Sequence, residues 1–157
     1  MHKYIIATIK DWNINQYNRS IYKKSKNWYL VTDTKKLTIE YVKSIKPKYI
    51  FFPHWSKKVN SKIINNYECV CFHETDVPYG RGGSPIQNLI LRNHKTTIIS
   101  ALKMIDVLDA GPIYLKKPLK LNGNAQQIYE RSSQKVFEMI NIIVKKKIMP
   151  VAQKGKV

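Results

Sequence analysis

The sequence CVCFHETDVPYGRGGSPIQ, residues 69–87, carries most of the information that decides the fold. Its first four residues are apolar and are typical of a buried strand, which would end at His73. Prolines and glycines follow up to Pro85, where a pattern of helical spacing begins. Ligands bind at the carboxyl ends of strands in open α/β sheets, so we expect a binding site in the loop after His73.

The rest of the chain alternates between strand-like and helix-like segments. Apolar runs rich in β-branched and aromatic residues predict strands at residues 4–9, 28–31, 49–52, 97–102 and 111–115. Apolar residues at helical spacing predict helices at residues 13–24, 37–45, 60–66, 85–92 and 125–147. This order predicts an α/β fold, with a mostly parallel twisted sheet, helices on both faces and right-handed crossovers. The last two strands flank a Gly-Pro turn and indicate an antiparallel hairpin near the site.

The length and charge of the chain bound its class and its partners. A chain of 157 residues forms one domain with a real core, since a domain of this size buries about 70% of its unfolded surface. The formal net charge of +18 suits nucleic acid as a partner. However, nearly all the basic residues are lysines, whereas arginine best matches phosphates and base edges. We therefore expect the positive field to steer small anionic ligands, with nucleic acid as the alternative.

Cysteine usage and hydropathy indicate the compartment. The two cysteines, Cys69 and Cys71, lie too close on one strand to bond each other comfortably. The apolar run at residues 4–9 is too short for a secretory signal, and no stretch approaches the length of a membrane span. We expect a cytoplasmic protein that does not enter membranes.

Three motifs together resemble the formyltetrahydrofolate-dependent formyltransferase family. The family pattern is Asn-x-His, a Leu-Pro-x-x-x-Gly-type loop and Asp-x-Gly-Pro-Ile. The matching residues here are Cys71-Phe72-His73, the loop at residues 77–87 and Asp109-Ala110-Gly111-Pro112-Ile113. No single motif is specific without the others. Within the family, residues 73–90 are most similar to the small sugar-nucleotide formyltransferases of pseudaminic acid pathways.

The resemblance implies one Rossmann-like formyltransferase catalytic domain over residues 1–157, without the C-terminal β-barrel domain of the tRNA enzymes. It implies N10-formyltetrahydrofolate as co-substrate and a nucleotide-linked amino-deoxysugar as acceptor. Methionyl-tRNA and glycinamide ribonucleotide are the alternative acceptors. A family member that binds folate without transferring formyl groups is a further alternative.

Formyl transfer requires a group that takes the amine proton and a donor to the carbonyl oxygen, which becomes an oxyanion. By the resemblance, His73 takes or relays the proton, while Asp109 orients His73, stabilises its charged form or relays the proton through water. The family's asparagine is Cys71 here, and loss of one oxyanion donor typically lowers the rate about 10²- to 10³-fold. Protonated His73, a backbone N–H or water would have to replace it.

The sequence leaves two other roles open to Cys71. It could accept the formyl group as a nucleophile, with His73 as base. Cys69, Cys71 and His73 share one strand face and could ligate a metal, although zinc sites usually draw ligands from a second cluster. We expect no metal, and cysteines that pack as small hydrophobes.

The folate pocket is expected to draw on the loop after the third strand, the glycine loop and the Asp109 turn. The residues are Phe52, His54, Trp55, Gly80, Arg81, Gly82, Gly83, Leu108 and Gly111. Arg81 would grip a phosphate or a substrate hydroxyl. The structural alternatives are solvated loop positions for His54 and Arg81, and a core-capping position for Trp55. An apolar edge strand near Thr97 would allow two copies to pair as a homodimer.

Overall fold

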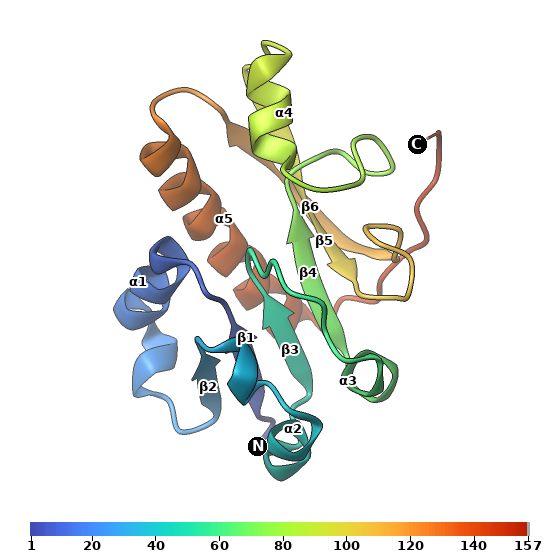
Figure 1. Cartoon of the computed structure of the whole chain (residues 1–157). Helices are drawn as coiled ribbons and strands as arrows, with labels where there is room; N and C mark the ends of the chain where they lie inside the picture. Colours follow the sequence, from blue (N-terminus) through green and yellow to red (C-terminus); the bar gives the residue numbers. More distant parts are fainter. Residues whose placement is uncertain (157) are drawn as a thin grey trace. The chain divides into compact units, whose positions relative to one another are not determined.

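The computed structural model describes residues 1–156, which form two compact units (Figure 1). Unit 1 comprises Met1–Cys71, and unit 2 begins at Phe72. The boundary falls within one strand, so the strands of both units belong to one sheet with the order β2-β1-β3-β4-β5-β6. This order confirms the predicted α/β fold with a mostly parallel sheet.

Unit 1 contains the parallel part of the sheet. Its strands are β1 (Tyr4–Ala7), β2 (Trp28–Val31), β3 (Tyr49–Phe52) and the start of β4 (Cys69–His73). β1 pairs with β2 and β3, and β3 pairs with β4, in parallel throughout. Ile5, Ile6 and Ala7 are fully buried, as expected for a strand covered on both faces.

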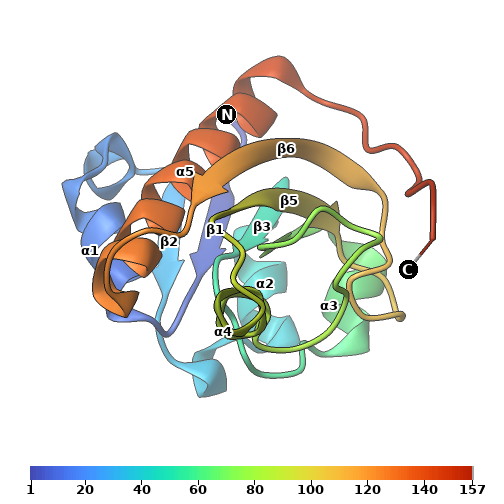
Figure 2. The same ribbon diagram turned by 90° about the horizontal axis from the view of Figure 1, so that it is seen from above.

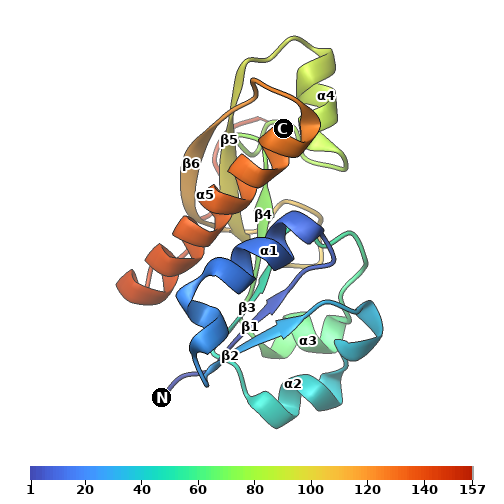
Figure 3. The same ribbon diagram turned by 90° about the vertical axis from the view of Figure 1, so that its left-hand side faces the viewer.

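The helices of unit 1 cover both faces of these strands. They are α1 (Asp11–Arg19), the 3₁₀ turns η1 (Ile21–Lys24) and η2 (Thr34–Lys36), α2 (Ile39–Ile45) and α3 (Ser61–Asn66). Figure 3 shows α1 on one face and α2 with α3 on the other. The helix predicted over residues 13–24 is instead two segments, because the Ser20 hydroxyl donates to the Tyr17 carbonyl and accepts from the Tyr22 N–H.

Aromatic rings stack at the amino-terminal side of this unit. The Trp28 indole stacks on Tyr22 at 3.9 Å and on Tyr4 at 4.5 Å between ring centroids. Burial in this cluster raises the pKa of Tyr22 to about 12. The rings therefore pack as core despite their hydroxyl groups.

Unit 2 is a hairpin covered by a long helix. Its elements after β4 are α4 (Pro85–Leu91), β5 (Thr96–Lys103), β6 (Ile113–Lys120) and α5 (Ala125–Lys146). β5 and β6 pair antiparallel, as predicted, and α5 lies along them (Figure 2). A capping box of Asn124 and Gln127 begins α5.

The strand predicted near Thr97 is present, but the prediction that it lies at an edge of the sheet is wrong. Thr97 pairs with Leu119, and β5 lies between β4 and β6, so both of its edges are occupied. The edge strand of unit 2 is β6, which also continues beyond its predicted end at residue 115. Lysines and Pro118 on β6 are residues that discourage pairing with another chain. Within residues 1–156, no helix is long and apolar enough to cross a membrane.

Candidate active site

Unit 2 brings His73 and Asp109 together. His73 ends β4, and Asp109 lies in the turn between β5 and β6. The Nδ1 atom of His73 lies 3.5 Å from Oδ1 of Asp109, and the two side chains are only 8% and 10% exposed. An imidazole and a carboxylate, predicted from separate motifs, thus face each other with little solvent between them.

The other ring nitrogen of His73 is also engaged. Its Nε2 atom lies 2.7 Å from the carbonyl oxygen of Gly80. A carbonyl can only accept, so this hydrogen bond requires a proton on Nε2. A lone pair on Nδ1 would then face the Asp109 carboxylate, whereas a second proton there makes the contact attractive. The two ring nitrogens of His73 therefore both face acceptors, the Gly80 carbonyl and the Asp109 carboxylate.

Buried hydroxyl groups hold the Gly80 carbonyl in place. The Thr75 hydroxyl donates to the carbonyl of Tyr79 at 2.6 Å and lies 3.3 Å from that of Gly80. The Ser100 hydroxyl in turn donates to the Thr75 carbonyl at 2.7 Å. Sequence reasoning missed Thr75 and Ser100, because only the folded loop shows which carbonyls their hydroxyls reach.

Asp109 is fixed by a second contact and by its backbone. Its Oδ2 atom accepts a hydrogen bond of 2.9 Å from the N–H of Gly82, in the glycine loop. Its φ angle is +54°, a left-handed conformation that aspartate tolerates better than most residues. At Gly111 a Cβ atom would lie 1.7 Å from the Lys103 carbonyl oxygen, so no larger residue fits this turn.

Arg81 was predicted to grip a phosphate or a hydroxyl. In the structure its Nε and Nη2 atoms donate to Oε1 of Gln153, at 3.2 and 2.8 Å. Gly83 is exposed, and its carbonyl accepts from the Asn88 side chain at 3.3 Å. Leu108 is 71% exposed beside the Asp109 turn.

The predicted pocket loop of unit 1 holds His54 in a defined state. The Trp12 indole N–H donates to Nδ1 of His54 at 3.1 Å, and the Asn13 amide nitrogen lies 2.9 Å from the same atom. An indole N–H can only donate, so Nδ1 carries a lone pair and the ring proton is on Nε2. His54 also has a φ angle of +50°, which fixes the direction of its side chain.

Two buried polar atoms of unit 1 lack a hydrogen bond within residues 1–156. They are Oδ1 of Asn13 and Nε1 of Trp55. Trp55 packs edge-on against Phe52, which is 2% exposed, at 5.8 Å between ring centroids. One acceptor and one donor are therefore available near the predicted pocket loop, where a heterocyclic ligand with both kinds of group would satisfy them.

Cys71 lies on β4, where it is opposite Phe52 of β3 in the parallel register. Neither Cys69 nor Cys71 forms a disulfide. Among residues 1–156, no group of three or more His, Cys, Asp and Glu side chains is placed to hold a metal ion.

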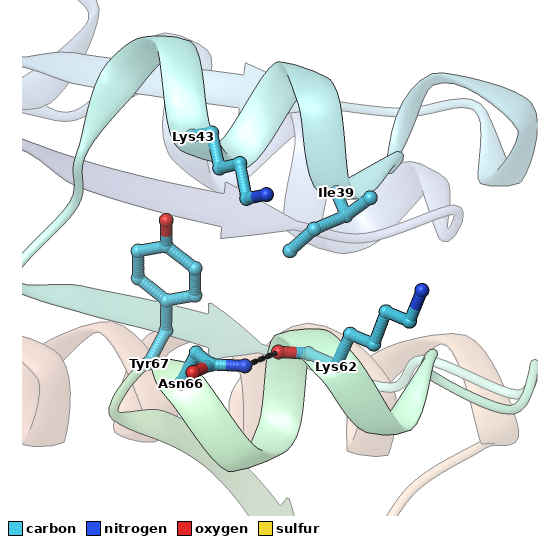
Figure 4. A pocket seen from close by; sticks show the side chains of 5 residues that line it. All are labelled: Ile39, Lys43, Lys62, Asn66 and Tyr67. Atoms are coloured by element: carbon cyan, nitrogen blue, oxygen red, sulfur yellow. Dashed lines mark hydrogen bonds between the residues drawn. The ribbon is translucent and has the colours of Figure 1, made fainter.

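A surface hollow of about 380 Å³ lies between α2 and α3 (Figure 4). It is lined by Ile39, Lys43, Lys62, Asn66 and Tyr67. None of the predicted site residues lines it, and it contains no paired acid and base. The candidate active site is therefore at His73 and Asp109, where an imidazole and a carboxylate face each other.

No family model matches the chain. The chain is 31% identical to methionyl-tRNA formyltransferase of Thermotoga maritima over 90 residues. This alignment covers 56% of this chain and 29% of that protein. Against methionyl-tRNA formyltransferase of Thermodesulfovibrio yellowstonii it is 28% identical over 127 residues, or 76% of this chain and 41% of that protein. The chain thus spans less than half the length of these curated relatives.

Solved structures agree over the whole chain. The structure of methionyl-tRNA formyltransferase from Clostridium thermocellum matches with a TM-score of 0.96 and 44% identity, over 100% of this chain and 70% of that one. The formyltransferase PseJ from Anoxybacillus kamchatkensis, solved with a formamido sugar nucleotide and tetrahydrofolate, matches with a TM-score of 0.71 over 98% of this chain and 82% of that one. At 15% identity, PseJ shows a shared fold only.

Proposed function

This chain belongs to the formyltransferase family, and we propose that it transfers a formyl group from N10-formyltetrahydrofolate to a primary amine. The observation that carries the proposal is the His73–Asp109 pair, at 3.5 Å and shielded from solvent. The pair joins the first and the third of the family's motifs. The Gly80 carbonyl contacts Nε2 of His73, and the Gly82 N–H donates to Oδ2 of Asp109.

The contacts of the pair suggest how the work is divided. N10-formyltetrahydrofolate supplies the formyl carbonyl, and negative charge develops on its oxygen as the amine attacks. His73, whose Nε2–H is held by the Gly80 carbonyl, gives a proton to the leaving nitrogen. Asp109 orients the ring from its Nδ1 side and accepts the amine proton directly or through water.

Cys71 makes this division more important. A thiol is a weak donor, so it replaces poorly the amide of the family's asparagine. The imidazole of His73 is then the side-chain donor left to stabilise the oxyanion. We propose Cys71 as a residue beside the reacting centre and not as a nucleophile, because Nε2 of His73 faces the Gly80 carbonyl and Nδ1 faces Asp109, so both ring nitrogens are already engaged.

The donors and acceptors of unit 1 fit a folate. A pterin ring presents hydrogen-bond donors and acceptors on one flat edge, and the unsatisfied atoms of Asn13 and Trp55 offer one of each. We propose Phe52, His54 and Trp55 as pocket residues, with His54 held as an Nε2–H donor by Trp12.

We propose methionyl-tRNA as the first acceptor to test. The relatives that are 31% and 44% identical to this chain carry that name. The net charge of +18 also suits a polyphosphate partner. An amino sugar linked to a nucleotide is the second candidate, supported by the resemblance of residues 73–90 to the sugar enzymes.

A direct comparison of acceptors tests this. The protein is incubated with N10-formyltetrahydrofolate and either methionyl-tRNA or a uridine-diphosphate 4-amino sugar, and the product is weighed by mass spectrometry. We expect one formyl group on methionyl-tRNA, at a rate that falls as salt rises. Turnover on the sugar alone would reverse the order of acceptors. Folate binding in calorimetry without turnover would identify a binding protein, and the absence of both would overturn the proposal.

A further inference from the structure

The segment after α5 returns to the Asp109 turn. Val151 and Ile113 exchange two backbone hydrogen bonds, of 2.7 and 2.8 Å, which fix this segment on the start of β6. Gln153 follows two residues later, and its side chain is half-buried. The end of the chain is therefore held beside the turn that carries the proposed catalytic carboxylate.

Every hydrogen-bonding position of the Gln153 amide is occupied. Its Nε2 atom donates to the carbonyls of Asp109 and Gly111, at 2.8 and 2.9 Å. Its Oε1 atom accepts two bonds from Arg81, at 2.8 and 3.2 Å. Carbonyls only accept and a guanidinium only donates, so the amide has one possible orientation.

These bonds restrain a residue whose backbone conformation is strained. The left-handed conformation of Asp109 is unfavourable for a residue other than glycine, and surrounding contacts must maintain it. Gln153 binds the carbonyl of Asp109 itself and that of Gly111, two residues later. It thus fixes both sides of the turn that directs the carboxylate at His73 and at the Gly82 N–H.

We propose that Gln153 is a positioning residue for Asp109, and through Asp109 for the ring of His73. This rests on the proposed function only for its effect on rate, since the hydrogen bonds exist whatever the acceptor. Gln153 also joins the turn to Arg81, so the glycine loop and the catalytic turn are held as one piece.

Substitutions can separate the two arms of Gln153. Gln153→Glu keeps an oxygen for Arg81 but places a second oxygen against two carbonyls, which breaks the arm to the turn. Arg81→Ala removes the opposite arm and leaves the turn bonds intact. Gln16→Glu is the matched control, because Gln16 also accepts from an arginine, Arg19, at 3.4 Å on exposed α1.

We expect Gln153→Glu to lower kcat about 10- to 100-fold, since a misplacement of about 1 Å can cost about 10²-fold. The KM for folate should change little, because folate binding does not require the Asp109 carboxylate to face His73. Arg81→Ala should lower kcat less than Gln153→Glu, and Gln16→Glu should match the wild type. Equal losses of kcat in Arg81→Ala and Gln153→Glu would overturn the assignment to the turn arm.

A readout independent of turnover comes from NMR. The Gly82 amide proton and the ring nitrogens of His73 should shift in Gln153→Glu, because both contact the Asp109 carboxylate. If the wild type transfers no formyl group to any acceptor, the proposed function fails while these shifts still test the positioning. Unchanged shifts would reject the positioning role even in an active enzyme. If Gln153→Glu does not fold, Gln153→Ala removes the same donors without adding charge and should move both signals in the same direction.

Discussion

Two histidines lie at the ends of neighbouring strands in this molecule, and their ring nitrogens face opposite kinds of hydrogen-bonding partner. His54 follows β3 in unit 1, and an indole N–H and an amide nitrogen approach its Nδ1. His73 ends β4 in unit 2, and a carbonyl and a carboxylate approach its two nitrogens. Donors therefore face the first ring, whereas acceptors face the second.

The difference shows how one residue type can serve binding and catalysis in the same fold. A ring whose Nδ1 accepts keeps its Nε2–H for recognising an acceptor atom on a ligand. A ring aligned by a carboxylate is suited to moving a proton and to donating to negative charge as it develops. The amino acid at the strand end is the same, and the residues that fold around it decide which role it can take.

The largest effect is expected from removing the imidazole of His73. His73→Ala should lower kcat about 10²- to 10⁴-fold, the usual contribution of a positioned acid or base. His54→Ala should instead weaken folate binding and leave kcat within about threefold, since it removes a binding contact. Steady-state kinetics on both variants provide the measurement. Equal losses of kcat would show that the two histidines do not differ in role.

Asp109→Asn tests the carboxylate that faces His73. The asparagine can still accept from the Gly82 N–H, but it no longer carries the negative charge that faces Nδ1. We expect kcat to fall about 10²-fold or more, because the amine proton loses its acceptor. Steady-state kinetics measure this effect. An unchanged kcat would mean that the reaction does not need the charge of Asp109.

Asn13→Ala acts on the neutral histidine through its support. The Asn13 amide is fully buried and donates to the Thr8 hydroxyl and the Pro53 carbonyl, so its loss removes two buried hydrogen bonds. The free energy of unfolding in urea should fall by about 1–3 kcal/mol. Asn18→Ala, at an exposed position of the same helix, is the control and should change it little. Similar losses in both would remove the special status of Asn13.

Trp12→Phe is the smallest change. Phenylalanine keeps a ring against His54 but removes the indole N–H that fixes its tautomer. Folate affinity should fall about 2- to 10-fold, the worth of one hydrogen bond, while kcat is unaffected. Calorimetric titration with folate measures this. An unchanged affinity would show that the tautomer of His54 does not contribute to binding.

The fold could be predicted because its signals are local. Runs such as Tyr49–Phe52 are apolar throughout, and every residue of that strand is buried. Element ends were less predictable where a side chain competes with the backbone, as Ser20 does between α1 and η1. The edge strand was misplaced because apolar content near Thr97 does not say which strands lie beside it.

The site was predictable only in part. Motifs indicated His73 and Asp109, but not the second hydrogen-bond partner of the His73 ring. That partner is the Gly80 carbonyl, which the Thr75 hydroxyl holds in place. Trp12 and His54 are 42 residues apart, and Arg81 and Gln153 are 72 residues apart. No local pattern predicts contacts over such distances. Gln153 lies outside the three motifs, and only the folded chain shows its partners.

The stacked rings around Trp28 give the protein a built-in optical reporter. All three tryptophans, Trp12, Trp28 and Trp55, lie in unit 1, so indole fluorescence records that unit alone. Tyr22 and Tyr4 lie close enough to Trp28 to pass their excitation energy to it, and separation of these rings would restore tyrosine emission. Emission spectra can therefore follow unit 1 without a label. Trp12 and Trp55 would also report by quenching whether a pterin reaches the loop that contains His54.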